Sequence, residues 1–250
     1  MIGAKPELTK DHFDAVLFDL DGVLTDTARI HATAWRLMFD EFLAERATAT
    51  GEPFDPFDVD ADYHEHVDGK PRYDGVRSFL ASRGIELPQG APDDPPGSGT
   101  ICGLGNRKNE KVQEALSTQG VDVFPSSVEL VRQLRAAGIR TAVVSASANC
   151  AAVLRAAEID DLFETRVDGV TLAERELPGK PSPESFLEAA RELGVEPARA
   201  VVVEDAISGV EAGRAGDFGL VIGVARKDNA TALAEAGADV VVADLAELLA

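Results

Sequence analysis

Short, continuous runs of apolar residues, separated by stretches with apolar residues at helical spacing, fill the second half of the chain. The runs are rich in valine and bounded by polar residues, which is typical of strands buried on both faces of a sheet. Strands are therefore expected at residues 15–18, 141–144, 200–203, 220–224 and 239–242. Because helical patterns alternate with these runs, we expect a parallel sheet covered by helices on both faces.

The helical spacing of apolar residues predicts the elements between these strands and a separate helical segment near the start of the chain. Helices are expected at residues 27–46, 72–83, 107–119, 126–137, 149–157, 183–193, 207–215 and 229–236. A serine cap and Gly138 are expected to bound the helix at 126–137. Nothing between residues 28 and 120 has the pattern of a strand. The first strand therefore belongs with the second half, and an all-helical segment interrupts them.

This order of elements predicts an α/β fold with a Rossmann-like parallel sheet as its core and an inserted helical cap domain. The core is expected to comprise residues 1–27 and 120–250, and the cap residues 28–119. Within the cap, two polar insertions near residues 47–60 and 86–100 are rich in Asp, Pro and Gly, so we expect loops there.

Composition limits the classes of partner and the compartment. The chain has 250 residues, 45% of them hydrophobic, and a net charge of −20, which disfavours binding to nucleic acid or to anionic membranes. No apolar run is long enough to span a bilayer and no secretory signal precedes the first strand, so a cytoplasmic protein is expected. Cys102 and Cys150 form no CxxC motif, so no disulfide framework is expected. We expect a monomer or a weak homo-oligomer.

The most informative polar segment follows the first apolar run. Asp19 and Asp21 lie two residues apart directly after the expected strand, and Gly22 follows where the backbone must turn tightly. Two carboxylates at such a short separation repel each other unless a cation lies between them, and Mg²⁺ prefers such oxygen ligands. A carboxylate can also attack phosphorus and form an aspartyl-phosphate. Ordinary turn chemistry is the alternative; a calcium loop is disfavoured because its later glutamate is missing.

Further polar residues follow other strand ends, where doubly wound folds bind their ligands. Ser145 follows one strand at a helix start and can hold phosphate oxygens, with a simple helix cap as the alternative. Lys180 can neutralise charge that grows during phosphoryl transfer, although most lysines are merely solvated. Glu204 and Asp205 follow another strand and can complete an acidic metal cage with Asp19, with turn chemistry as the alternative. Four such placements together favour a phosphoryl-transfer site.

Asp-x-Asp-Gly, Ser, Lys-Pro and Glu-Asp, in this order, resemble the four motifs of the haloacid dehalogenase superfamily of phosphotransferases. The resemblance covers residues 14–245 and implies that Asp19 is the nucleophile and Asp21 the general acid/base, with Ser145 and Lys180 completing the catalytic set. It also implies Mg²⁺ as the cofactor. The implied metal ligands are Asp19, the Asp21 carbonyl, Glu204 and Asp205. The helical insert resembles the cap that closes over the site in this superfamily.

A narrower resemblance, to the β-phosphoglucomutase family, is carried by Asp26-Thr27-Ala28 with His31 and Trp35, and by Val67-Asp68-Gly69-Lys70-Pro71-Arg72, Arg107-Lys108-Asn109 and Ser145-Ala146-Ser147-Ala148-Asn149. It implies that Arg72 clamps the phosphate that is not transferred, assisted by the segment with Ala146, Ser147 and Asn149. Lys108 and Gly69 are implied to contact the sugar, and Thr27 and His31 to position the general acid/base. The chain departs from this family at Ala148, where a lysine is common, at Lys70-Pro71, and in the two cap insertions.

These resemblances imply an Mg²⁺-dependent enzyme that interconverts β-glucose 1-phosphate and glucose 6-phosphate through the 1,6-bisphosphate. A phosphatase that shares the core residues is the alternative, and a non-catalytic receiver module is disfavoured because its acidic pair would come first in the chain. The expected partner is a small phosphorylated sugar. Two weaker patterns are expected to be structural: Gly209, Gly213 and Gly216 in helix packing, and His64 and His66 in a solvated acidic loop.

Overall fold

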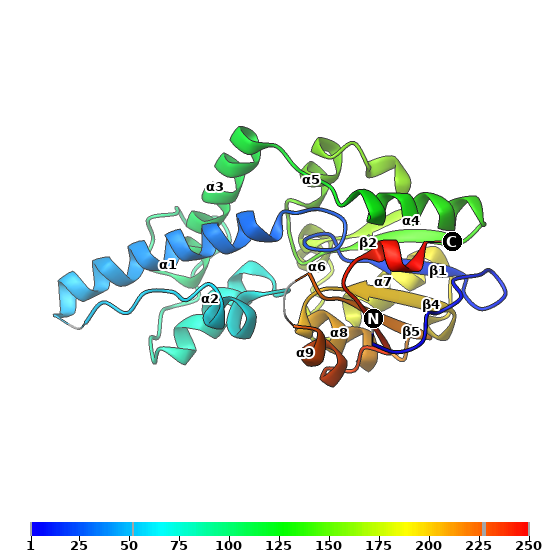
Figure 1. Cartoon of the computed structure of the whole chain (residues 1–250). Coiled ribbons are helices and arrows are strands. Elements are labelled where there is room, and N and C mark those ends of the chain that lie inside the picture. Colours follow the sequence, from blue (N-terminus) through cyan, green and yellow to red (C-terminus); the bar gives the residue numbers. More distant parts are fainter. Residues whose placement is uncertain (1, 52, 227–228, 250) are drawn as a thin grey trace. The chain divides into compact units, whose positions relative to one another are not determined.

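The computed structural model describes residues 2–51, 53–226 and 229–249 of the chain, which divides into two compact units (Figure 1). Residues 1–26 and 121–250 form one unit, the core unit, and residues 27–120 form the other, the insert. No helix among the described residues has both the length and the apolar character needed to cross a membrane.

The core unit is built on a six-stranded parallel sheet with the order β3-β2-β1-β4-β5-β6. Its strands are β1 (Ala15–Phe18), β2 (Arg140–Val144), β3 (Thr165–Val167), β4 (Ala200–Glu204), β5 (Leu220–Val224) and β6 (Val240–Val242). This is the Rossmann-like doubly wound order, so the predicted fold class is confirmed. The insert leaves the core after β1, the central strand, and the chain returns before β2.

Helices cover the sheet because its strands are apolar on both sides. They are α4 (Pro125–Ala136), α5 (Cys150–Ala156), α6 (Gly169–Glu174), α7 (Glu184–Leu193), α8 (Ile207–Ala215) and α9 (Ala230–Glu235). Leu17 and Val202 point to one face and pack against Phe186 of α7 and Ala212 of α8. The alternate residue Phe18 is also fully buried, and α4 packs against β2.

The strand register brings the carboxyl ends of three strands level with one another. Phe18 of β1 pairs with Val143 of β2 and with Val203 of β4. The residues that follow β1, Asp19 and its successors, therefore lie beside the ends of both neighbouring strands. Here the connections of a doubly wound sheet diverge, which is where such folds place their ligand sites.

Several local predictions were wrong at element boundaries. Helix α4 begins at Pro125 after Phe124 without a side-chain cap, because proline suits the first helical position and no serine cap is needed. Strand β3 and helix α6 were missed. The only apolar residue in β3 is Val167, which leaves no apolar run to detect, and Asp168 caps the short α6 by accepting from the N–H groups of Val170 and Thr171.

The insert contains α1 (Ala28–Thr50), a π-helical turn (Tyr63–Val67), α2 (Arg72–Ser82) and α3 (Ile101–Gln119), and no strand among its described residues. Its apolar centre is aromatic: Phe39 stacks on Trp35 and Phe57, and lies against Phe79 with 4.1 Å between ring centroids. Helix α3 begins six residues earlier than expected, because the Thr100 side chain accepts a hydrogen bond from the Gly103 N–H and caps it.

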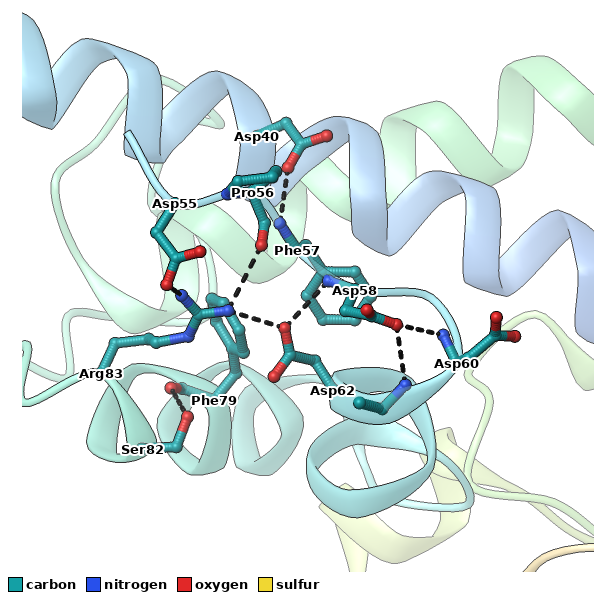
Figure 2. A network of polar contacts seen from close by, with 11 residues as sticks. Asp40, Asp55, Pro56, Phe57, Asp58, Asp60, Asp62, Phe79, Ser82 and Arg83 are labelled. Atoms are coloured by element: carbon teal, nitrogen blue, oxygen red, sulfur yellow. Dashed lines mark hydrogen bonds and ion pairs between the residues drawn. The ribbon is translucent and has the colours of Figure 1, made fainter. Parts of the chain in front are cut away.

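Arg83, just after α2, ties the polar segment 53–62 to the rest of the insert (Figure 2). Its guanidinium forms ion pairs with Asp55 and Asp62, donates to the Pro56 carbonyl, and lies 5.1 Å from the Phe79 ring centroid. The neighbouring Phe57 N–H donates to the Asp40 side chain (2.8 Å). This segment, most of which belongs to the polar insertion expected near residues 47–60, is thus anchored at its apolar and its charged residues.

Candidate functional site

The core unit brings Asp19, Lys180 and Glu204 into direct contact. The Lys180 ammonium donates to Asp19 Oδ1 and to Glu204 Oε1, both at 2.5 Å, and to the Val144 carbonyl at 3.3 Å. All three charged side chains are at least nine-tenths buried. Since Asp19 follows β1 and Glu204 ends β4, the paired strands bring the two carboxylates to the same edge of the sheet.

Two glycines give the carboxylates room. A Cβ on Gly209 would lie 1.9 Å from Glu204 Oε1, so only glycine lets this side chain fold back against α8. Gly22 adopts a φ of +89°, and a Cβ there would lie 1.9 Å from Asp205 Oδ2. Gly213 instead approaches Val202 of the sheet, as its expected packing role requires.

In the described contacts of the cluster, carboxyl groups outnumber the positive charges. Burial alone would lower the pKa of Lys180, but the Asp19 and Glu204 carboxylates outweigh it and raise the pKa above its ordinary value, so the ammonium persists. Burial raises the pKa of Glu204 against the opposing positive charge of Lys180. Asp205 adds a third carboxylate beside one lysine. The cluster therefore carries excess negative charge that a cation would neutralise.

The donor set fits a hard divalent cation. Asp19, Glu204 and Asp205 each offer a carboxylate oxygen, and these oxygens lie within 4.8 Å of one another. They form the one such group of potential ligands among the described residues. The segment with His64 and His66, expected to be a solvated loop, is instead the π-helical turn Tyr63–Val67. His64 instead bonds Asp68 (3.0 Å), and Asp58 accepts from the N–H groups of Asp60 and Ala61.

Ser145 lies at the end of β2, next to the carbonyl that Lys180 contacts. Its Oγ accepts from the Ser147 N–H (3.1 Å), and Ser147 Oγ accepts from the Asn149 N–H (3.2 Å). Helix α5 has Asn149 as its N-cap and no side-chain cap bond, so neither serine is a helix cap. The serines instead shape the loop Ser145–Asn149, which includes Ala146 and precedes α5.

Sequence reasoning missed the support beneath this loop. A Cβ on Gly169 would lie 2.6 Å from the Ala146 carbonyl oxygen and 2.7 Å from the Ala148 nitrogen, so the first residue of α6 packs tightly against the loop. The buried Asp168 accepts from Arg166 Nε (2.7 Å). An Asp-Gly pair just ahead of a helix was the available signal, but it followed no recognised strand.

Within the insert, the structure joins three of the expected substrate residues. The Lys108 ammonium donates to His31 Nδ1 (2.8 Å) and lies 4.8 Å from the Trp35 ring centroid. Burial lowers the pKa of His31 well below 6.5, and the positive charge of Lys108 adds to this effect. The ring is therefore neutral, and because Nδ1 accepts, its proton lies on Nε2.

The other expected residues of the insert lie at or just before the starts of α1 and α2. Thr27 is buried and precedes α1, one turn before His31, whose N–H donates to the Thr27 carbonyl (3.0 Å). Gly69 adopts a φ of +70° after the π-helical turn. Arg72 is the first residue of α2, half-buried, with its guanidinium 5.3 Å from the Tyr73 ring centroid.

Comparisons with known proteins agree with the motifs in the sequence. A family model of haloacid dehalogenase-like hydrolases matches residues 13–217. The β-phosphoglucomutase of Mycobacterium bovis is 57% identical over 238 residues, which cover 94% of this chain and 91% of that protein. The β-phosphoglucomutase of Bacillus subtilis is 35% identical over 211 residues, covering 84% and 83%. A crystal structure of β-phosphoglucomutase from Clostridium difficile matches with a TM-score of 0.73 at 25% identity, over 95% of this chain and 93% of that one.

Proposed function

Because the chain belongs to the haloacid dehalogenase-like hydrolase family, we propose that it is a β-phosphoglucomutase. The observation that carries this proposal is the 57% identity to a β-phosphoglucomutase over 94% of the chain, together with the buried cluster of Asp19, Lys180 and Glu204. The substrates are β-glucose 1-phosphate and glucose 6-phosphate, with the 1,6-bisphosphate as the intermediate that passes between them.

In the proposed reaction, a carboxylate oxygen of Asp19 attacks phosphorus, and the bond from phosphorus to the sugar oxygen breaks. Asp21 gives a proton to the departing sugar oxygen and later removes one from the hydroxyl that attacks the aspartyl-phosphate. Lys180, held charged by its two carboxylate neighbours, offsets the negative charge on the transferring group. Ser145 and the loop that follows it hold phosphate oxygens.

The cofactor we propose is Mg²⁺, held by Asp19, Glu204, Asp205 and the Asp21 carbonyl. The three carboxylates supply the excess negative charge and the hard oxygen donors that this ion requires. When bound, it supplies positive charge beside the phosphate oxygens.

We assign the second phosphate and the sugar to the insert and to the loop after β2. Arg72 binds the phosphate that is not transferred, together with Ser147 and Asn149, since a guanidinium suits bidentate phosphate binding. Lys108, Gly69 and Trp35 are assigned to the sugar, and Thr27 and His31 to positioning the general acid/base. The direct Lys108–His31 bond supports a shared role for these two side chains.

Phosphorus NMR of the purified protein with β-glucose 1-phosphate, Mg²⁺ and a trace of glucose 1,6-bisphosphate tests the proposal. Glucose 6-phosphate should accumulate with little inorganic phosphate, and Asp19→Asn should abolish the conversion. The exposed Asp161→Asn is the matched control and should keep full activity. Rapid release of phosphate from many sugar phosphates, without isomerisation, would instead make the protein a phosphatase with the same core chemistry.

A further inference from the structure

Three consecutive carbonyl groups in the turn after Asp21 accept hydrogen bonds from other parts of the core unit. The Gly22 carbonyl accepts from Arg226 Nε (3.2 Å), and the Val23 carbonyl accepts from Ser127 Oγ (2.6 Å). The Leu24 carbonyl accepts from the Phe124 N–H (2.9 Å). All three donors lie at least one hundred residues further along the chain than the carbonyl they contact, and all belong to the core unit.

Arg226 connects these donors to one another. Its guanidinium donates to Ser127 Oγ (3.2 Å), lies 3.7 Å from the Phe124 ring centroid, and forms an ion pair with Asp244. Only 16% of the side chain is exposed. A planar guanidinium can make these contacts together because its N–H groups point in fixed, different directions, whereas a lysine ammonium offers no such plane.

A second residue close to Arg226 in the chain contacts the loop after β4, which carries Asp205. Asn229, three residues further along, donates from Nδ2 to the Asp205 carbonyl (3.3 Å). Gly22 in turn leaves the space that the Asp205 side chain occupies. Arg226 and Asn229, which both follow β5, therefore contact the backbone of the turn after β1 and of the loop after β4.

We propose that Arg226 is a positioning residue that, with Ser127, orients the Asp21 carboxyl for proton transfer. The inference rests on the proposed function only in taking Asp21 as the proton donor and acceptor. Gly22 follows Asp21 directly and has the conformational freedom of glycine, with a φ of +89° here, so the bond from Arg226 to the Gly22 carbonyl limits rotation at Gly22 and with it movement of Asp21. Asp19, by contrast, is fixed through β1, since its N–H donates to the Val203 carbonyl (2.9 Å).

Two phosphoryl donors can distinguish a defect in the position of Asp21 from a defect at Asp19. Acetyl phosphate phosphorylates Asp19 when the bond from phosphorus to the acetyl oxygen breaks, and acetate leaves with the electron pair and needs no proton. Transfer from or to a sugar oxygen requires a proton from or to Asp21. A variant that misplaces Asp21 alone should therefore lose sugar-phosphate turnover and keep phosphorylation by acetyl phosphate.

The experiment compares Arg226→Lys with wild type and with the exposed Arg214→Lys, which pairs only at the surface with Asp239. We expect Arg226→Lys to lower kcat for isomerisation at least tenfold, with KM and the rate of phosphorylation by acetyl phosphate changed less than twofold. Asp21→Asn should give the same selective pattern, and adding Arg226→Lys to it should cost less than twofold more. Arg214→Lys should match wild type in every measurement.

Equal loss of both reactions in Arg226→Lys would overturn the proposal, because a general loss of structure lowers both, and so would no loss in either. Ser127→Ala, which removes one donor to the turn and one partner of Arg226, is tested in the same way if Arg226→Lys does not fold. If wild type hydrolyses glucose 6-phosphate without isomerising β-glucose 1-phosphate, the proposed function fails. The two-donor comparison then uses the hydrolysis rate and still decides the role of Arg226.

Discussion

At the scale of single residues, the acidic cluster depends on positions that lack a side chain. Gly209→Ala would place a methyl group against Glu204 Oε1, so Glu204 or α8 must move. We expect a loss of about 1–3 kcal/mol in the free energy of unfolding. We also expect at least a tenfold rise in the Mg²⁺ concentration for half-maximal activity. Urea unfolding and a Mg²⁺ titration of activity test this. Gly99→Ala, which meets open space, should change neither quantity.

A second residue, His31, should make stability depend on pH. Burial and Lys108 lower its pKa in the folded chain well below 6.5, although Asp68 opposes this. Below pH 6.5 the unfolded chain therefore binds a proton that the folded chain does not, and stability falls as the pH falls. The loss attributable to His31 is at most about 1.4 kcal/mol for each pH unit below 6.5.

Urea unfolding at pH 7.5 and pH 5.5 measures this loss. His31→Gln should lose less stability between the two pH values than wild type, while the exposed His12→Gln should lose as much as wild type. An unchanged pH dependence in His31→Gln would show that its imidazole is not kept neutral by the fold.

At the scale of elements, the segment 53–62 should contribute to the stability of the insert. Arg83→Met removes two ion pairs and a hydrogen bond to the Pro56 carbonyl, at a cost of about 1–2 kcal/mol. Phe57→Ala leaves a cavity between Phe39 and Phe79 and should cost about 3–5 kcal/mol.

Fluorescence of the single tryptophan, Trp35, reports unfolding of the insert, because this residue is buried against Phe39. Arg77→Met is the control: it removes a half-exposed pair with Asp74 within α2 and an exposed hydrogen bond to Gln89 Oε1 (2.7 Å), so the loss should stay below about 1 kcal/mol. Equal costs for Arg83→Met and Arg77→Met would mean that the segment is not anchored as drawn in Figure 2.

The elements also explain which parts of the fold the sequence could predict. The valine runs of β4 and β5 and the periodicity of α8 and α1 are strong local signals, and all four elements were predicted within a few residues. Strand β3 is three residues long with one buried side chain, so its structure comes from pairing with β2 rather than from its own sequence.

At the scale of the whole molecule, the contact of Asp19, Lys180 and Glu204 was predictable because central parallel strands end at a shared edge. The hydrogen bonds that fix the turn after Asp21 could not be predicted from the sequence. Ser127, Phe124 and Arg226 lie on segments whose meeting depends on how α4 and the loop after β5 pack, and no motif marks them. Motifs thus identify the reacting groups, whereas the residues that support them emerge from tertiary packing.

The two units should be separable at the point where the chain leaves and re-enters the core. The Asp26 N–H donates to the Asp122 carbonyl (2.9 Å), and Thr25 forms an isolated β-bridge with Val123, so both connections begin side by side. The aromatic cluster around Phe39 draws all its members from the insert. Replacing residues 28–119 with a short Gly-Ser linker should therefore leave a core that unfolds cooperatively.

That shortened protein should still be phosphorylated on Asp19 by acetyl phosphate, because the cluster lies within the core unit. It should lose isomerisation of β-glucose 1-phosphate by at least a hundredfold, because His31, Arg72 and Lys108 are gone. Circular dichroism during urea unfolding and phosphorus NMR measure the two properties. Asp19→Asn in the same shortened protein controls for phosphorylation elsewhere. Isomerisation that survives removal of the insert would contradict the assignment of sugar binding to these residues, because the core alone would then select the substrate.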